Sequence, residues 1–155
     1  MQKINPIPEG FHSVTPHIVV KDIQRASDFY KKAFGSEERR SIPGSDGKPM
    51  HAEIKIGNSV LMLMAENQKM GSRSPATLGG TPVVLALYVT DVDKSYKRAI
   101  DAGAKSIAPP KDMFWGDRYS QVSDLEGHIW SIAMHIKDPT PAVLSAAMKA
   151  ECVTA

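Results

Sequence analysis

The sequence predicts an α+β protein made of two tandem modules, each with the order strand, helix and three strands. The first observation is an internal repeat: the segment VVKD, which ends at Asp22, recurs as YVTD, which ends at Asp91, 69 residues further on (91 − 22 = 69). The second is that each Asp precedes apolar residues at helical spacing, and that each run stops at a glycine, Gly35 or Gly103. Two copies about 70 residues apart are typical of a duplication within one domain.

The length of the chain fits a single domain. A chain of 155 residues buries roughly two thirds of its unfolded surface on folding, so a sizeable core is possible. A stretch rich in glycine, serine and proline separates the two halves of the pattern. We therefore expect one domain over residues 1–155, with a first module over about 11–65, a linker over about 66–81, a second module over about 82–137 and a short helix over about 140–149.

The first module begins with the extended run TPHIVV, in which alternate side chains point to opposite faces. Asp22 can cap the following helix and Gly35 can end it. A short strand is expected over about 37–41. The runs HAEIKI and SVLMLM are joined by Gly57-Asn58, which is a good hairpin signal. The apolar face of the helix is expected to hold Ile23, Ala26, Tyr30, Ala33 and Phe34.

The second module repeats this order. A strand over 83–89 leads to a helix that Gly103 can end, and a short strand is expected over about 105–107. The runs RYSQVS and HIWSIAMHI, separated by the turn DLEG, predict the closing hairpin. Beyond it, Thr140 as a cap residue and Pro141 at the first helical position predict the short terminal helix.

Composition and charge argue against several classes of function. The net charge of +2, with acidic and basic residues interspersed, provides no strong field for nucleic acid. No apolar run approaches the ~20 residues that span a bilayer, so no membrane partner is expected. The beginning MQKINPIPEG lacks the apolar core of a secretory signal, and the single Cys152 cannot close a disulfide within the chain. A cytoplasmic location is therefore expected.

Six segments, spread over nearly the whole chain, carry a resemblance to a known family: HSVTPHIVVKD, DFYKKAFGSEE, MHAEIKIG, LYVTDVD, DMFWGDRY and GHIWSIAMH. They resemble the vicinal oxygen chelate superfamily, which includes glyoxalase I, bleomycin-resistance proteins, fosfomycin-resistance enzymes and extradiol dioxygenases. Within it they look like the PhnB-like branch of glyoxalase/bleomycin-resistance proteins. The resemblance implies paired βαβββ modules that form a half-open β-barrel around a cleft, commonly completed as a homodimer.

The resemblance also implies where a metal would bind. Metal-dependent members carry His at the starts of the two repeated strands and Glu in the closing strand, and the matching positions here hold Thr15, Val84 and Ser131. A valine has no donor atom, and neutral hydroxyls bind Zn²⁺ or Fe²⁺ poorly compared with His, Cys or carboxylate. We therefore expect no cofactor, and the metal-dependent activities of the family do not follow from the resemblance.

Strand alternation, counted from these positions, turns Ser131 and four further polar side chains toward the expected cleft. The four could form an alternative site for a divalent metal such as Zn, Ni or Fe. They could equally orient an organic ligand by hydrogen bonds, or lie as polar residues on a wet sheet face. Glu53 is the candidate general base, because a carboxylate beside His in a partly apolar cleft can have a pKa near neutrality. The four residues are His17, His51, Glu53 and His135.

The segment DMFWGDRY is a second candidate region. Trp115 and Tyr119 offer flat apolar surface, and Arg118 adds a fixed cation, which suits a flat or anionic ligand. In an alternative interpretation, Asp117 and Arg118 pair with each other or hold the loop, while the aromatic rings fill a barrel end or a dimer interface.

Three functions remain open. The favoured one is a metal-free, homodimeric binding protein of the bleomycin-resistance kind, whose clefts hold a small organic ligand that is flat or anionic. The alternatives are a glyoxalase-like lyase or isomerase that uses the non-standard metal ligands, and a non-catalytic dimeric scaffold. The candidate ligand-binding residues are His17, His51, Trp115, Arg118, Tyr119, Ser131 and His135.

Overall fold

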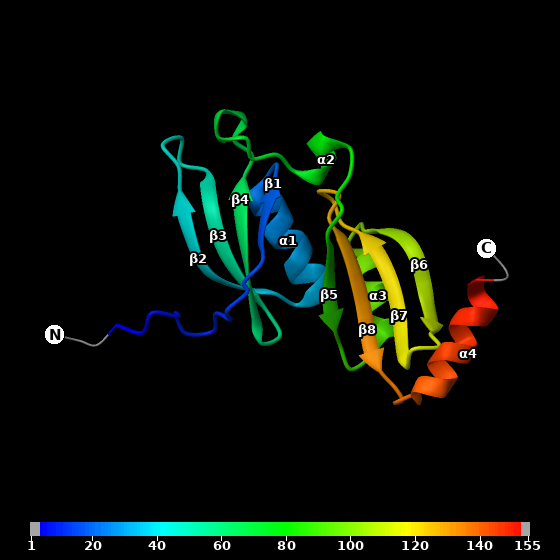
Figure 1. Cartoon of the computed structure of the whole chain (residues 1–155). Coiled ribbons are helices and arrows are strands. Elements are labelled where there is room, and N and C mark those ends of the chain that lie inside the picture. The colour runs from blue at the N-terminus through cyan, green and yellow to red at the C-terminus, as the bar shows by residue number, and fades with distance from the viewer. Residues whose placement is uncertain (1–3, 153–155) are drawn as a thin grey trace.

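The computed structural model describes residues 4–152, which form two four-stranded sheets side by side, each backed by a helix (Figure 1). The N-terminal half of the chain builds one sheet and the C-terminal half builds the other. Within residues 4–152, no helix is long and apolar enough to cross a membrane.

The first module has one helix and four strands in the expected order. Its helix α1 spans Ile23–Phe34, and its strands are β1 (His17–Val20), β2 (Glu37–Pro43), β3 (Pro49–Ile56) and β4 (Ser59–Ala65). The strand order in the sheet is β1-β4-β3-β2. β1 runs parallel to β4, whereas the other neighbours are antiparallel.

The second module repeats this arrangement. Its elements are β5 (Val84–Tyr88), α3 (Val92–Asp101), β6 (Lys105–Asp112), β7 (Asp117–Ser123) and β8 (Ile129–His135), and the sheet order is β5-β8-β7-β6. Two short helical segments lie between the modules, η1 (Gln68–Met70) and α2 (Pro75–Leu78). The matched strand order confirms the predicted α+β fold with two βαβββ modules.

Helices α1 and α3 both begin at the predicted aspartates. The Asp22 side chain accepts a hydrogen bond of 2.9 Å from the backbone N–H of Arg25, and Asp91 accepts one of 2.9 Å from that of Lys94. Each cap residue has extended backbone angles, which is the geometry of an N-cap. The first helix ends at Gly35 with φ of 70°, a left-handed conformation that glycine adopts at little cost.

One apolar core runs through both modules, because α1 and α3 pack against each other as well as against their own sheets. The Trp130 ring of β8 lies 5.5 Å from the ring of Tyr30 and 4.8 Å from that of Phe34, both on α1. Buried Asp124 accepts hydrogen bonds of 2.6 Å from the Tyr30 hydroxyl and 3.0 Å from the Trp130 indole. The modules are therefore joined on their helical sides.

The turn between β7 and β8 strengthens this junction. Its side chains Asp124, Glu126 and His128 are all buried. Glu126 accepts a 2.7 Å hydrogen bond from the backbone N–H of Lys21, and the His128 ring lies 2.9 Å from the carbonyl oxygen of Val19. Three buried polar groups of the second module thus find partners in or beside the first, as buried polar groups must.

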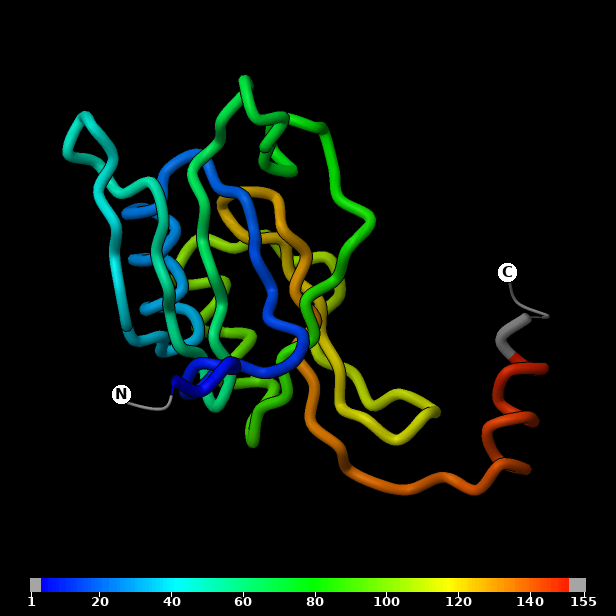
Figure 2. Tube along the Cα trace, turned by 60° about the vertical axis from the view of Figure 1, so that its left-hand side comes forward, coloured from blue at the N-terminus to red at the C-terminus, as the bar shows by residue number. Residues whose placement is uncertain are grey.

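Two segments differ from the sequence-based expectation. β6 runs to Asp112, well past the expected residue 107, because it is an edge strand, where prolines such as Pro109 and Pro110 are tolerated. The terminal helix α4 spans Pro141–Cys152 rather than 140–149. Figure 2 shows that it stands clear of the sheets at the end of an extended segment.

Candidate functional site

The face of each sheet opposite its helix is open, and strand alternation decides which side chains it carries. In β5, Val84, Ala86 and Tyr88 are exposed, whereas Leu85 and Leu87 are partly buried against the core. We call the uncovered side of each sheet its open face. The same alternation places the predicted ligand-binding residues in the strands of both modules on open faces, with the exception of Arg118.

The open face of the first module brings together three of the predicted residues. The rings of His17 and His51 lie 5.4 Å apart and nearly perpendicular, and His51 Nε2 is 4.0 Å from Glu53 Oε1. Met62 lies between His17 and Glu53, since it pairs with both across the sheet. Partial burial, followed by the nearby His51, lowers the pKa of His17 below its ordinary value. Both effects favour a neutral imidazole at His17.

These three side chains are close but not bonded to one another. A separation of 4.0 Å between His51 and Glu53 is longer than a hydrogen bond, so both keep unused hydrogen-bonding capacity. Their side chains are only 21% and 15% exposed, and that exposed surface lies on the open face. The group can therefore accept and donate hydrogen bonds to a molecule placed against β3, and Glu53 can accept a proton there.

The open face of the second module carries a tighter network. Asp117, buried at the start of β7, has one oxygen 2.9 Å from His135 Nδ1, while its other oxygen accepts a 3.0 Å bond from the Tyr88 hydroxyl. The other ring nitrogen of His135, Nε2, is 2.9 Å from Asp138. His135 thus lies between two carboxylates, one buried and one exposed.

The charges of this network shift its pKa values in consistent directions. Hydrogen bonding to Asp117, and then to Asp138, raises the pKa of His135 above its ordinary value. The same bond from His135 lowers the pKa of Asp117, with a smaller contribution from Tyr88. Its bond to Asp117 also raises the pKa of the Tyr88 hydroxyl. These shifts favour an imidazolium at His135, a carboxylate at Asp117 and a neutral phenol at Tyr88.

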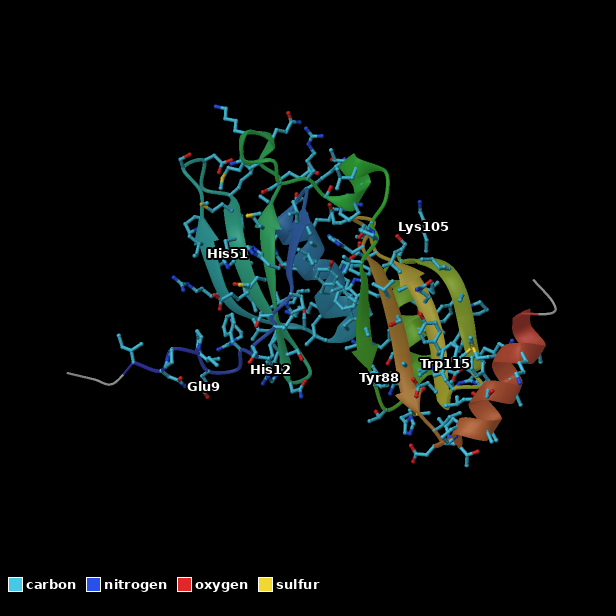
Figure 3. All side chains as sticks on the ribbon, viewed as in Figure 1. Glu9, His12, His51, Tyr88, Lys105 and Trp115 are labelled. Carbon is cyan, nitrogen blue, oxygen red and sulfur yellow. The ribbon has the colours of Figure 1, made fainter. Side chains whose placement is uncertain are left out.

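Aromatic side chains extend this face toward the β6–β7 turn. The Trp115 ring packs edge to face against Tyr119, with 5.7 Å between centroids, and Trp115 remains 36% exposed. The Gln121 amide donates a 3.3 Å hydrogen bond to the Tyr119 hydroxyl. Ser131 pairs with Gln121 across the sheet but is only 4% exposed, so it offers little surface to a ligand. In Figure 3, Trp115 and Tyr88 lie on the second module, apart from His51 on the first.

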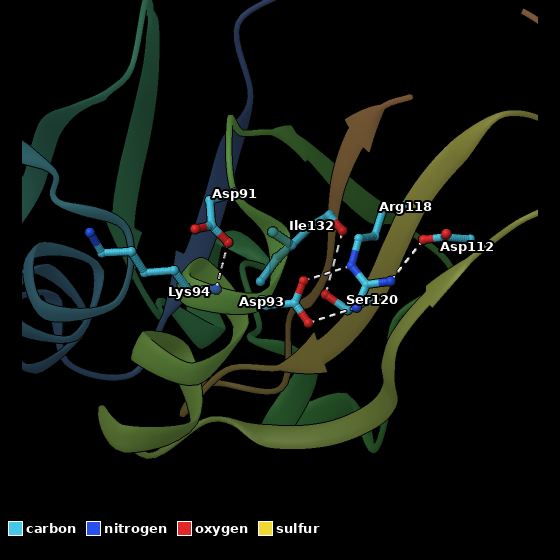
Figure 4. A network of polar contacts seen from close by, with 7 residues as sticks. All are labelled: Asp91, Asp93, Lys94, Asp112, Arg118, Ser120 and Ile132. Carbon is cyan, nitrogen blue, oxygen red and sulfur yellow. Dashed lines mark hydrogen bonds and ion pairs between the residues drawn. The ribbon is translucent and has the colours of Figure 1, made fainter. Parts of the chain in front are cut away.

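Arg118 does not lie on the open face. It precedes Tyr119 in β7 and therefore points to the opposite side, toward α3. There its guanidinium donates bonds of 2.6 and 2.7 Å to the two oxygens of Asp93 and one of 2.7 Å to Asp112 (Figure 4). These bonds raise the pKa of Arg118 and lower that of Asp93. The structure thus has Arg118 linking α3 to β6, and its partners are Asp93 and Asp112 rather than the Asp117 of the second interpretation.

The alternative metal-ligand set is not assembled within one chain. His17, His51 and Glu53 belong to the first sheet, whereas His135 belongs to the second and is bonded through both ring nitrogens. Among the residues that the structure describes, no three His, Cys, Asp or Glu side chains converge closely enough to hold a metal ion.

A hollow of about 380 Å³ lies between the modules, where β5 meets the turn between β3 and β4. Tyr88 borders it, and most of its wall is apolar, including Leu61, Leu85 and Trp130. A volume of this size lies at the lower end of the range for small-molecule sites.

Two residues of the network around His135, Asp117 and Asp138, are absent from the ligand-binding candidates that the sequence suggests. The sequence points to Asp117 only as a partner of Arg118 or as a residue that holds the loop. The alternation of β7 puts Asp117 on the same face as Tyr119, which was available from the sequence. The pairing of Asp117 with His135 depends on the register of β7 and β8, which cannot be read from the sequence.

Comparison with known proteins agrees with this architecture. A family model described as the Glyoxalase/Bleomycin resistance protein/Dioxygenase superfamily matches residues 10–132. An uncharacterized protein of Mycobacterium bovis is 41% identical over 142 residues, which cover 90% of this chain and 93% of that protein. The chain therefore belongs to the glyoxalase/bleomycin resistance protein/dioxygenase superfamily.

Two solved structures of this fold share limited sequence identity with the chain. TioX from Micromonospora sp. ML1 superposes with a TM-score of 0.63 at 27% identity, covering 83% of this chain and all (100%) of TioX. The fosfomycin resistance protein FosX from Listeria monocytogenes, solved with Mn(II) and sulfate, has a TM-score of 0.61 at 17% identity and covers 88% of this chain and 97% of FosX. At 17% identity, the likeness to FosX concerns the fold alone.

Proposed function

We propose that this protein binds a small organic molecule on its open sheet faces, in the manner of bleomycin-resistance proteins and without the usual metal of its superfamily. The observation that supports this most is the network on the second module, in which Asp117, itself bonded to the Tyr88 hydroxyl, holds His135 on the face that also carries exposed Trp115. Oriented polar groups next to apolar surface are the general composition of a ligand site.

The three positions at which the family resemblance expects metal ligands support a metal-free mode. They hold Thr15, Val84 and Ser131. In the structure, Val84 offers only apolar surface to the open face, and the Ser131 hydroxyl is nearly covered. We also propose that the chain belongs to the PhnB-like branch, which its sequence segments resemble.

A homodimer is part of the proposal, because each open face is a shallow surface in a single chain. Val84 is 45% exposed and Tyr88 is 64% exposed on the open face of the second module. Exposed apolar side chains grouped on one face are typical of an interface or a ligand site. A second copy that covers this face would convert it into a cleft. We also propose a cytoplasmic location, for which the support is the sequence alone.

A thermal-shift screen with a broad set of flat and anionic compounds tests the binding function. A ligand present at a hundred times its Kd stabilises the folded state by about 2.7 kcal/mol, which gives a readily measured rise in unfolding temperature. Size-exclusion chromatography with light scattering tests the dimer. A screen in which no compound shifts the transition would contradict binding and favour the dimeric scaffold.

A glyoxalase-like lyase or isomerase is the second candidate, favoured by the proximity of His51 to Glu53 on a largely covered patch. Elemental analysis of protein purified without chelator distinguishes the two functions. Tightly bound metal in stoichiometric amount, lost in His51→Gln and Glu53→Gln but kept in the exposed control His12→Gln, would establish the second candidate. Equal metal content in all four proteins would remove both residues as ligands.

A further inference from the structure

His135 has the hydrogen-bonding pattern of a cation. Both of its ring nitrogens lie 2.9 Å from carboxylate oxygens, Nδ1 from Asp117 and Nε2 from Asp138. Carboxylates only accept hydrogen bonds, and a neutral imidazole has only one N–H to donate. The imidazolium, with a proton on each ring nitrogen, is the form that can donate both bonds to carboxylates, and it carries a positive charge.

The two carboxylates bind His135 in very different environments. The Asp117 side chain is 10% exposed and is also held by the Tyr88 hydroxyl at 3.0 Å, so it forms a fixed support for the ring. The Asp138 side chain is 98% exposed. Exposed ion pairs contribute little to stability, because water and salt compete with them. The bond between Nε2 and Asp138 is thus the one that another anion can replace.

The backbone around Asp138 explains why its carboxylate reaches this nitrogen. The backbone N–H groups of Ile136 and Lys137 both donate to the carbonyl oxygen of Gly116, at 2.9 and 3.1 Å. Gly116 itself has no room for a side chain, since a Cβ there would lie 2.1 Å from the carbonyl oxygen of Lys137. This close approach fixes the chain beyond β8, and with it the residue that faces His135.

We propose that Asp138 is an internal substitute for the carboxylate of a ligand, and that an aromatic carboxylate displaces it to bind His135 Nε2. The inference rests on the proposed binding function and names its ligand class. Replacing one carboxylate by another conserves the charge of the network, because Asp117 and the ligand then flank the imidazolium. Trp115, 36% exposed and packed against Tyr119, provides an aromatic surface on the same face for the ring of the ligand.

Benzoate is the simplest probe of this exchange, and benzamide is its neutral counterpart. Isothermal titration calorimetry on the full chain should show benzoate binding more tightly than benzamide. Asp138→Asn removes the competing charge and should tighten benzoate binding about 1.5- to fivefold, the range expected when an exposed ion pair no longer competes. Affinity for benzamide should not change. His135→Gln should abolish the preference for benzoate, with folding checked by the unfolding temperature.

Asp101→Asn is the matched control. Asp101 is an exposed carboxylate on α3, paired with Lys97 at 2.6 Å, so its loss changes the net charge by the same amount without touching His135. Its benzoate affinity should equal that of the wild type. Equal benzoate affinities for Asp138→Asn and Asp101→Asn would overturn the inference, as would undetectable benzoate binding by both wild type and Asp138→Asn. If other compounds still stabilise the protein, only this inference fails; if none does, the proposed function fails too.

Discussion

The two modules share one backbone frame but present different chemistry on their open faces. The same pairing of strands creates equivalent positions in both sheets, so that rows of side chains can be compared directly. The first module has two ionisable side chains in its row, one on each side of a methionine, whereas the second fills the same row with small or neutral side chains. Strand pairing therefore conserves position and leaves side-chain chemistry free to change. The compared rows are His17, Met62 and Glu53 in the first module, and Ala86, Ser131 and Gln121 in the second.

The closing hairpins differ in a second way. In the first module, Gly57 and Asn58 form a short exposed turn between β3 and β4. In the second, the longer turn between β7 and β8 buries Asp124, which accepts bonds from Tyr30 in the first module and from Trp130. The second module thus completes the core of the first, whereas the first turn has no comparable buried role.

The largest expected loss of stability comes from substituting Asp124, the buried acceptor in the turn of the second module. Asp124→Ala leaves the Tyr30 hydroxyl, the Trp130 indole and two backbone N–H groups without their acceptor in a buried place. The free energy of unfolding should fall by about 3 kcal/mol or more. Urea denaturation followed by tryptophan fluorescence measures the change. Asn58→Ala, in the exposed turn of the first module, should cost less than about 0.5 kcal/mol; similar losses for both variants would remove the asymmetry.

The turns between the second and third strands of the modules allow a matched pair of substitutions. Gly47 and Gly116 have positive φ, 79° and 104°, so alanine is strained at both. A Cβ at Gly47 would meet nothing within 4 Å, whereas one at Gly116 would overlap the Lys137 carbonyl. We expect Gly47→Ala to cost about 1 kcal/mol and Gly116→Ala about 2 kcal/mol or more, measured by denaturation. Equal costs would show that the segment after β8 moves freely away from Gly116.

A substitution of Arg118 tests which side of the second module carries a functional cation. Its bonds to Asp93 and Asp112 hold the back of the sheet, so Arg118→Gln should lower the unfolding temperature at low salt and leave benzoate affinity unchanged. The loss should shrink at high salt, since all three side chains reach solvent. A fall in benzoate affinity without any loss of stability would return Arg118 to the ligand site.

Local patterns predicted the frame well because the forces that set it are local. The capping aspartates, the glycine that ends α1 and the Gly57-Asn58 turn act within a few residues, and each appears in the structure as expected. The site was harder, because it depends on register and chain path. Arg118 and Tyr119 are neighbours in one strand and had to point to opposite faces, so their grouping as one ligand contact overlooked strand alternation.

The contact between His135 and Asp138 shows a different limit of the sequence. It depends on how the chain leaves β8, which is fixed by a backbone contact with Gly116 in another turn. No period or motif encodes that approach. The same is true of α4, whose capping Thr140 and first-position proline predict a helix but contain no information about where it lies.

The smallest expected effect is the pH dependence of stability, to which His17 and His135 contribute with opposite signs. Starting from the ordinary histidine value of 6.5, the folded pKa is lowered for His17 and raised for His135. His135 therefore adds stability below pH 6.5, and this contribution is lost as pH rises through its folded pKa. For His17, the folded state resists protonation, so stability is lost as pH falls below 6.5.

Urea denaturation of His17→Gln and His135→Gln between pH 5.5 and 8 measures both contributions to the free energy of unfolding. Relative to wild type, His135→Gln should be most destabilised at the acid end, whereas His17→Gln should be relatively more stable there. Parallel profiles for the two variants would mean that the open faces do not differ in charge preference, and the contrast between the modules would then reduce to shape.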